Sequence, residues 1–570
     1  MRLLPVLAAA AIAACSPSEP QTSGETGTTA EAPATEYATM IVRGGPIHTA
    51  DDAVPTAEAV AVRDGRIVYV GDEAGVEALA GPETEIVELD GAALYPGFTD
   101  AHVHVLGVGS RERTLNLEGT ESITDLQDRV RAAAAELPEG SVLYGRGWIE
   151  THWPEGRFPN REDLDAAAPD HAVVLTRADG HALVANSLAL ERAGITADSI
   201  APEGGDILRD EAGEPTGMLI DTAMYPANAL VGDLEGAERA DTYAEGASVM
   251  ASLGWTGGHD MSVPYSDVAM IEGLAEEDRL PIRVYVSVNP DGLAALARET
   301  PRLADDGRVI TRAVKMYMDG ALGSRGAALL EPYSDAPSNQ GLMLSNEDET
   351  LSAFTEALRA GVQMNVHAIG DRGNRLLLDW VEAAYAAVPP EERAIENPRW
   401  RDEHTQIVDP ADIPRFAELG VIPSMQPSHA IGDLFFAPDR LGEERLDGAY
   451  AWRDLIDSGV VIAGGSDAPV ERGDPRIEFY AAVARRALDG TQTEEWHPDQ
   501  AVTRQEALRM FTAWPAYASF REDELGRIAV GLRADFTVFS EDIMTIPEED
   551  ILTVEPVMTI VDGEVVYSAR

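Results

Sequence analysis

The chain has 570 residues, of which 45% are hydrophobic and 25% charged, and its formal net charge is −56 at pH 7. This composition predicts a soluble globular protein, and the length allows about three to four domains or one large barrel with additions. The strong negative charge argues against binding to nucleic acid or to an anionic membrane surface, because attraction to phosphate dominates both kinds of binding. A single cysteine excludes a disulfide within the chain.

Residues 1–15 resemble a bacterial lipoprotein signal peptide. The apolar run from Leu3 to Ala14 is too short to span a bilayer, and it ends in the sequence IAAC, with Cys15 as the expected lipidated residue. An ordinary secretory signal with an incidental cysteine is the open alternative. Residues 16–36 are rich in Ser, Thr, Glu and Pro and are expected to form a disordered tether. We therefore expect attachment to a membrane of the bacterial cell envelope only through the N-terminal lipid, with the folded part in the periplasm or outside the cell.

Between about residues 93 and 525, apolar β-rich segments alternate with Ala-, Leu- and Glu-rich helical stretches. This alternation predicts an α/β fold, a (β/α)8 TIM barrel. Polar residues stand at the ends of the predicted strands, where the chemistry of such barrels takes place. The predicted strands are Ala93 to His104, Gly254 to Asp260, Ile282 to Val288, Val309 to Gly320, Val362 to Gly370, Trp400 to Gln406, Val421 to Pro427 and Val460 to Pro469.

Two β-rich pieces, residues 37–92 and 526–570, flank the predicted barrel. Neither is long enough to bury a core alone, so we expect one small β-sandwich built from both chain ends. The first two predicted barrel strands are separated by about 150 residues, far more than a crossover needs. The surplus, roughly residues 142–225, is expected to be an inserted lid over the barrel mouth.

Several residues with metal-ligand chemistry stand at the ends of predicted strands. His102 and His104 are two apart, so on a strand their imidazoles point to the same side and can bind one metal ion. His367 and His404 each close a later strand, and Asp467 closes the last one. Four histidines and a carboxylate at one barrel mouth suit a borderline metal such as zinc.

Lys315 is the only lysine among the 43 Lys and Arg residues of the chain. Arginine can replace lysine as a surface charge, but it cannot give up its proton to become a neutral amine. A single retained lysine therefore indicates amine chemistry at this position. Accidental survival of an unimportant lysine is the alternative that the sequence leaves open.

The chain resembles the amidohydrolase superfamily, specifically the family 3 branch that includes N-substituted formamide deformylase-like proteins. The resemblance covers nearly everything after the tether and is carried by PGFTDAHVH at Pro96, VKMYMDGALGSR at Val314, NVHAIGD at Asn365, SMQPSH at Ser424 and GSDAPV at Gly465. It implies one or two divalent metal ions, with zinc expected, and a CO2-derived carbamate on the strand-four lysine that bridges the metals in many relatives. The implied metal ligands are His102, His104, Lys315, His367, His404 and Asp467.

The resemblance also implies hydrolysis of a C–N bond in a small amide, formamide or cyclic amide by a metal-activated water. In this reading Asp467 acts first as general base and then as general acid. A mononuclear metal-dependent deaminase and a metal-depleted binding lipoprotein are the alternatives, and self-association into a homo-oligomer is left open. Weaker candidates for substrate binding, each with a structural role as the alternative, are His181 in the predicted lid, Asp319, Arg325 and His429.

Overall fold

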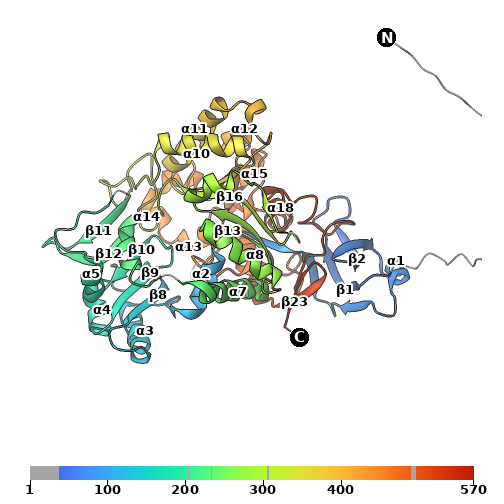
Figure 1. Ribbon diagram of the computed structural model, residues 1–570, viewed down its shortest axis with the longest axis horizontal. Coiled ribbons are helices and arrows are strands. Elements are labelled where there is room, and N and C mark those ends of the chain that lie inside the picture. Colours follow the sequence, from blue (N-terminus) through green and yellow to red (C-terminus); the bar gives the residue numbers. More distant parts are fainter. Residues whose placement is uncertain (1–36, 203, 233, 305–306, 489–495, 570) are drawn as a thin grey trace, which may run out of the picture.

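The computed structural model describes residues 37–202, 204–232, 234–304, 307–488 and 496–569. The predicted signal peptide and tether lie outside these residues. Three sheets make up the molecule: a central barrel, an inserted sheet on one side and a sheet formed by the chain ends on the other (Figure 1). Within the described ranges, no helix is both long and apolar enough to cross a membrane.

The central sheet consists of eight parallel strands in the order of the chain, which confirms the predicted α/β barrel. One predicted strand, Ala93 to His104, is divided at Gly97. Its first half, β5 (Ala93–Pro96), pairs with the sheet of the chain ends, and only its second half enters the barrel. The barrel strands are β6 (Phe98–Val103), β13 (Trp255–Val263), β14 (Arg283–Val288), β16 (Val309–Tyr317), β17 (Gln363–Ala368), β18 (Arg401–His404), β19 (Ile422–Met425) and β20 (Ala463–Gly464), and β15 (Arg302–Leu303) pairs with β16.

The first and last barrel strands meet just beyond the end of β20. The backbone N–H of Asp467 donates to the carbonyl of His102 at 2.6 Å, and the N–H of His104 donates to the carbonyl of Ala468 at 2.8 Å. These bonds nearly close the barrel. They also bring the residues that follow β6 and β20 to the same mouth, where the C-terminal ends of parallel strands gather.

The barrel helices bury apolar residues, and several of them also have capping residues at their ends. In α10 (Glu347–Ala360), for example, the Asn346 side chain accepts a hydrogen bond from the Glu349 N–H, Phe354 and Leu358 are buried one turn apart, and the helix ends at Gly361 with φ +77°. The other helices around the barrel are α2 (Val105–Arg113), α7 (Gly236–Leu253), α8 (Val268–Glu276), α9 (Leu293–Leu296), α11 (Asp371–Ala387), α12 (Ile413–Leu419), α13 (Pro427–Asp433), α14 (Ala437–Leu441), α15 (Trp452–Asp457), α16 (Pro475–Ala484), α17 (Arg504–Met510) and α18 (Ala513–Ala518).

The insertion after β6 contains its own six-stranded sheet. Trp148 and Trp153 belong to a buried cluster on one face, whereas Leu183 and Leu219 belong to a cluster on the other. The sheet begins upstream of residue 142, the start expected from the sequence, because β7 pairs with β8 and α3 packs against both strands. Its elements are β7 (Leu115–Asn116), α3 (Ile123–Glu136), β8 (Val142–Trp148), α4 (Arg161–Ala167), β9 (Ala172–Arg177), β10 (Ala182–Ala185), α5 (Ser187–Ala193), β11 (Gly205–Arg209), β12 (Pro215–Asp221) and α6 (Tyr225–Asn228).

The two chain ends form one eight-stranded sheet, seen in blue and red in Figure 1. The link is the antiparallel pairing of β5 with β21, in which Thr537 lies opposite Tyr95 and Val538 opposite Leu94. The two ends therefore share a core, as the sequence predicts. The elements of this sheet besides β5 are β1 (Met40–His48), β2 (Thr56–Arg63), β3 (Arg66–Gly71), β4 (Glu85–Glu88), β21 (Phe536–Phe539), β22 (Pro556–Val561) and β23 (Glu564–Ser568), with α1 (Glu73–Val76) beside them.

Candidate metal centre

Two histidines at the end of β6 and one aspartate after β20 form the first group of candidate ligands. The Nε2 atoms of His102 and His104 lie 3.6 and 3.2 Å from Oδ1 of Asp467. All three ligand atoms are within 4.8 Å of one another. His102 is fully buried and Asp467 is 6% exposed. This group matches the predicted HxH pair and strand-eight carboxylate.

Lys315 enters the same space from β16. Its Nζ atom lies 3.1 Å from Nε2 of His102, and the residue is 1% exposed. Burial lowers the pKa of Lys315 to about 8, because removal from water disfavours the charged amine. A substantial fraction of the amine is therefore neutral near physiological pH.

A second group of candidate ligands comes from β18 and from the segment after β19. His404, His429 and Asp467 hold ligand atoms within 4.8 Å of one another. His429 Nε2 lies 3.8 Å from Oδ2 of Asp467, while its Nδ1 accepts a hydrogen bond from the Gln406 amide at 2.9 Å. His429, predicted as a substrate contact, is thus placed among the possible ligands. His367 stands beside the group, with its ring centre 4.6 Å from that of His404.

Backbone strain marks two of these residues. His404 has φ +79° and Asp467 has φ +59°, a region that residues other than glycine seldom occupy. Such conformations persist where the surrounding structure holds them in place, and they are concentrated at functional sites. Here they turn two side chains at strand ends toward the common centre.

The protonation of the cluster suits metal binding. Burial lowers the pKa values of His102, His367 and His404 well below the ordinary value, so these imidazoles are neutral and keep a lone pair for a metal. Burial alone would raise the pKa of Asp467, but the imidazoles of His102 and His104 lower it below its usual range. The centre therefore offers neutral nitrogen atoms and one carboxylate.

Sequence reasoning missed the residues that orient His102. Its Nδ1 forms a 2.6 Å hydrogen bond with Oε2 of Glu403, whose other oxygen lies 2.8 Å from Nε of Arg401. Arg401 also contacts Nδ1 of His259 at 2.8 Å. A carboxylate on Nδ1 fixes the tautomer and leaves Nε2 free to bind a metal. The RDEH run in β18 was the available signal, since Arg401 and Glu403 share one face of that strand.

The insertion contributes His181, which lies between β9 and β10. Its Nδ1 contacts Oδ1 of Asp221 at 2.6 Å, and its ring centre is 5.3 Å from that of His367. Burial opposes protonation, but the hydrogen bond to Asp221 raises the pKa of His181. His181 and Asp467 both line two adjoining cavities of about 80 and 890 Å³. A residue of the insertion therefore reaches the centre.

Two predicted substrate contacts, Asp319 and Arg325, line neither of the two cavities at the centre. Asp319 is fully buried, and its carboxylate accepts hydrogen bonds from the backbone N–H groups of Ala328, Ile369 and Gly370. Arg325 pairs with Asp335 at 2.8 Å and lines neither cavity at the centre. Asp319 stabilises the loop after β16 through these hydrogen bonds, and Arg325 stabilises the outer side of the loop through its ion pair with Asp335.

The donor set fits a divalent cation. Oδ1 of Asp467 and Nε2 of His429 are buried and form no hydrogen bond of regular geometry with any described residue. Burial of unsatisfied polar atoms is unfavourable, and a cation bound between them would compensate for it. Nitrogen and carboxylate donors together suit zinc-like metals.

Comparisons with known proteins agree with this geometry. The family model described as "Amidohydrolase family" matches residues 85–567. The chain is 33% identical to YtcJ of Bacillus subtilis, with 92% of this chain and 99% of that protein covered. It is 28% identical to N-substituted formamide deformylase of Arthrobacter pascens, with 94% and 99% covered. An uncharacterized metal-dependent hydrolase from Pyrococcus horikoshii superposes with a TM-score of 0.70 at 26% identity, over 89% of this chain and 99% of that one. The chain belongs to the amidohydrolase family and is a metal-dependent hydrolase.

Proposed function

We propose that this protein hydrolyses a non-peptide C–N bond in a small amide, formamide or cyclic amide. The observation that carries the proposal is the convergence of His102, Lys315 and Asp467 on one buried centre, with 3.1 Å between the lysine and His102. Similarity to N-substituted formamide deformylase over nearly the whole chain supports the choice of bond. A divalent cation bound there would polarise the scissile carbonyl and lower the pKa of water.

Lys315 is proposed to carry a carbamate. Its neutral amine would attack the carbon of CO2, form an N–C bond and release one proton to solvent, which converts the amine into a carbamate that is a negatively charged oxygen donor. Burial of the amine favours this step because it lowers the pKa of Lys315 to about 8. The product would supply oxygen atoms beside His102, together with the remaining predicted ligands His104, His367, His404 and Asp467.

Asp467 is proposed to transfer a proton from the attacking water to the leaving amine. Its carboxylate lines both cavities and lies within 4 Å of the imidazoles of His104 and His429. Because its pKa is held below the usual range, it is ionised and can accept a proton from water, then pass it to the leaving amine. The larger cavity, about 890 Å³, leaves room for a small-molecule substrate.

The test is the metal content of the full chain purified without chelators, followed by a screen of N-formyl and N-acyl amines. About two metal ions per chain with release of amine would support the proposal. Close to one metal ion with release of ammonia from an amino-substituted ring would favour the deaminase instead. No metal after reconstitution with zinc and bicarbonate would favour a binding lipoprotein.

We also propose that the protein is anchored to a bacterial membrane through lipid on Cys15, with the catalytic part in the periplasm or outside the cell. The support is the apolar run ending in IAAC and the polar segment after it. Membrane fractionation and mass spectrometry of the N-terminal peptide test this. Cys15→Ser should release the protein into the soluble fraction, and an unchanged membrane fraction would contradict the proposal.

A further inference from the structure

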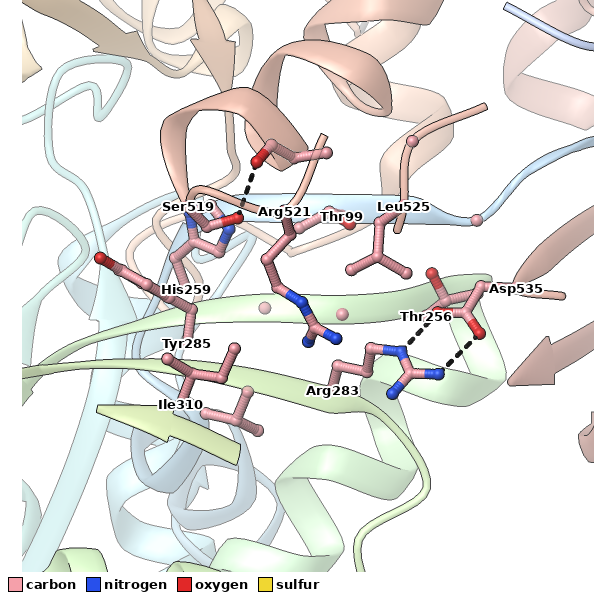
Figure 2. A pocket seen from close by; sticks show the side chains of 16 residues that line it. Thr99, Thr256, His259, Arg283, Tyr285, Ile310, Ser519, Arg521, Leu525 and Asp535 are labelled. Carbon is pink, nitrogen blue, oxygen red and sulfur yellow. Dashed lines mark hydrogen bonds and ion pairs between the residues drawn. The ribbon is translucent and has the colours of Figure 1, made fainter. Parts of the chain in front are cut away.

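A separate, small cavity of about 30 Å³ lies at the opposite end of the barrel (Figure 2). Thr256, Arg283 and Ile310 line it from the starts of β13, β14 and β16, whereas the candidate metal ligands lie at or just after the C-terminal ends of their strands. Other parts of the wall come from Gly97 and Thr99 at the start of β6, from α18 and the segment that follows it, and from Asp535. It shares no lining residue with the two cavities at the metal centre.

Two buried guanidinium groups face this cavity. Arg283 is 4% exposed and Arg521 is 7% exposed, and both line it. In Figure 2 the Arg521 side chain extends toward the strand that carries Arg283. Burial and the charge of Arg283 both lower the pKa of Arg521, so the two cations interact. Like charges repel strongly in a poorly solvated space, and an anion between them would remove that cost.

One N–H donor of Arg283 has no acceptor among the described residues. Nε and Nη2 of Arg283 donate to the carboxylate of Asp535 at 2.6 and 3.0 Å. Its Nη1 atom is buried and has no hydrogen-bond partner among the described residues. Asp535 cannot easily turn to meet it, because Oδ1 also accepts the backbone N–H of Asp562. A guanidinium group has five N–H donors, and a buried donor without an acceptor is unfavourable.

The residues that line the cavity limit which ligands can bind in it. Gly97, Gly257 and Gly258 line the cavity with backbone atoms, and Leu525 and Ile310 supply apolar surface. The carboxylates of Asp535 and Asp562 already bind Arg283, and that of Glu524 binds Arg521. These carboxylates would repel a multiply charged anion such as phosphate, but a singly charged one can bind beside the free Arg283 donor.

We propose that this cavity is a binding site for a small monovalent anion, a halide or a small carboxylate, held between Arg283 and Arg521 and accepting a hydrogen bond from Nη1 of Arg283. The ligand would connect β14 to the segment after α18, whose Arg521 also donates to the carbonyl of Gly307 at 2.8 Å. The site would therefore stabilise the base of the barrel where the C-terminal segment returns to it.

Bromide is the direct probe. Crystals of the unaltered chain soaked in sodium bromide should show an anomalous peak within hydrogen-bond distance of Nη1 of Arg283. Water at that position without any bromide would overturn the proposal. This measurement requires no substitution, so it does not depend on the folding of a variant.

Thermal unfolding provides the second test. At constant ionic strength, with gluconate replaced by chloride, the Tm of the unaltered chain should rise and saturate. Arg521→Met should lose most of this rise, and Arg521→Lys should keep part of it. Arg527→Met is the matched control, since Arg527 donates to the carbonyl of Glu522 and does not line the cavity. An equal chloride response in Arg521→Met and the unaltered chain would overturn the proposal.

Discussion

The Nζ atom of Lys315 lies 3.1 Å from Nε2 of His102, inside the barrel and shielded from solvent. A protonated lysine beside a neutral imidazole would compete with a metal ion for its lone pair. A carbamate at the same position would instead add a negative ligand. Whether Lys315 is an amine or a carbamate therefore decides whether it competes with a metal ion or helps to bind it.

Lys315→Ala should reduce bound metal and lower kcat by more than about 100-fold, the upper range for changes at residues that only support a ligand. Small carboxylates such as formate should restore part of the activity, because they can occupy the vacated space. Elemental analysis and steady-state kinetics measure both effects. Lys315→Arg is the matched control that keeps the charge but cannot form a carbamate, and it should fail as well. Normal metal content in Lys315→Ala would rule out the ligand role.

Asp467→Asn should lower kcat by about 10²- to 10⁴-fold, the range expected for loss of general acid–base catalysis. The amide retains one oxygen donor, so metal content should fall much less than activity. Asp433→Asn makes the same chemical change at another residue of the smaller cavity, where Asp433 contacts the Tyr450 hydroxyl. Comparable kcat losses in the two variants would argue against a proton-transfer role for Asp467.

Glu403→Gln should weaken metal binding by about 10- to 100-fold, because His102 loses the carboxylate that orients it. Chelator competition measures the affinity. The variant should also unfold at a lower temperature, since Arg401 would keep its buried charge without its 2.8 Å partner. A lower Tm with unchanged metal affinity would limit Glu403 to a structural role.

Asp319→Ala should reduce the free energy of unfolding by about 3 kcal/mol, because three backbone N–H groups would lose their acceptor. Denaturant titration measures this loss. Arg325→Met, which removes a partly exposed ion pair with Asp335, should change stability by no more than about 1 kcal/mol and leave KM unchanged. A raised KM in Arg325→Met would restore the predicted substrate contact.

The ion pair between Glu506 and Arg453, which are 2.9 Å apart, should make the free energy of unfolding depend on pH in the acid range. The Arg453 hydrogen bonds lower the pKa of Glu506 from 4.5 to about 2. The ionised form is therefore favoured in the folded state, and its contribution is complete above pH 4.5 and lost as the pH falls toward 2. Glu506→Gln should cost about 1 kcal/mol at pH 7 and nothing near pH 2. Unfolding curves across this range test it, with the exposed Glu564→Gln as control. A cost that persists at pH 2 would point to packing instead.

The sequence predicted the parts of the centre that depend on local pattern. His102 and His104 are two residues apart, so their common orientation follows from strand geometry. His404 and Asp467 could be placed at the mouth because each follows an apolar strand. Lys315 stood out as the only lysine in the chain.

The hydrogen bonds that hold these residues in place could not be predicted in the same way. Glu403 is 301 positions from His102, and only the barrel brings them within 2.6 Å. Asp319 and Arg325 follow the lysine so closely that a role at the site was a natural expectation. Their loop instead directs one toward the backbone N–H groups of Ile369 and Gly370 and the other toward Asp335.

The sequence by itself determined the eight strands, the residues at their ends and the shared sheet of the two chain ends, because apolar periodicity and turn residues act over short distances. Only the tertiary structure decided which polar groups come together: Glu403 contacts His102, His429 approaches Asp467, and Arg283 and Arg521 line one cavity at the base of the barrel. The physical reason is that hydrogen bonds and charges depend on distances of a few ångströms between elements, which closure of the barrel sets and the local pattern does not.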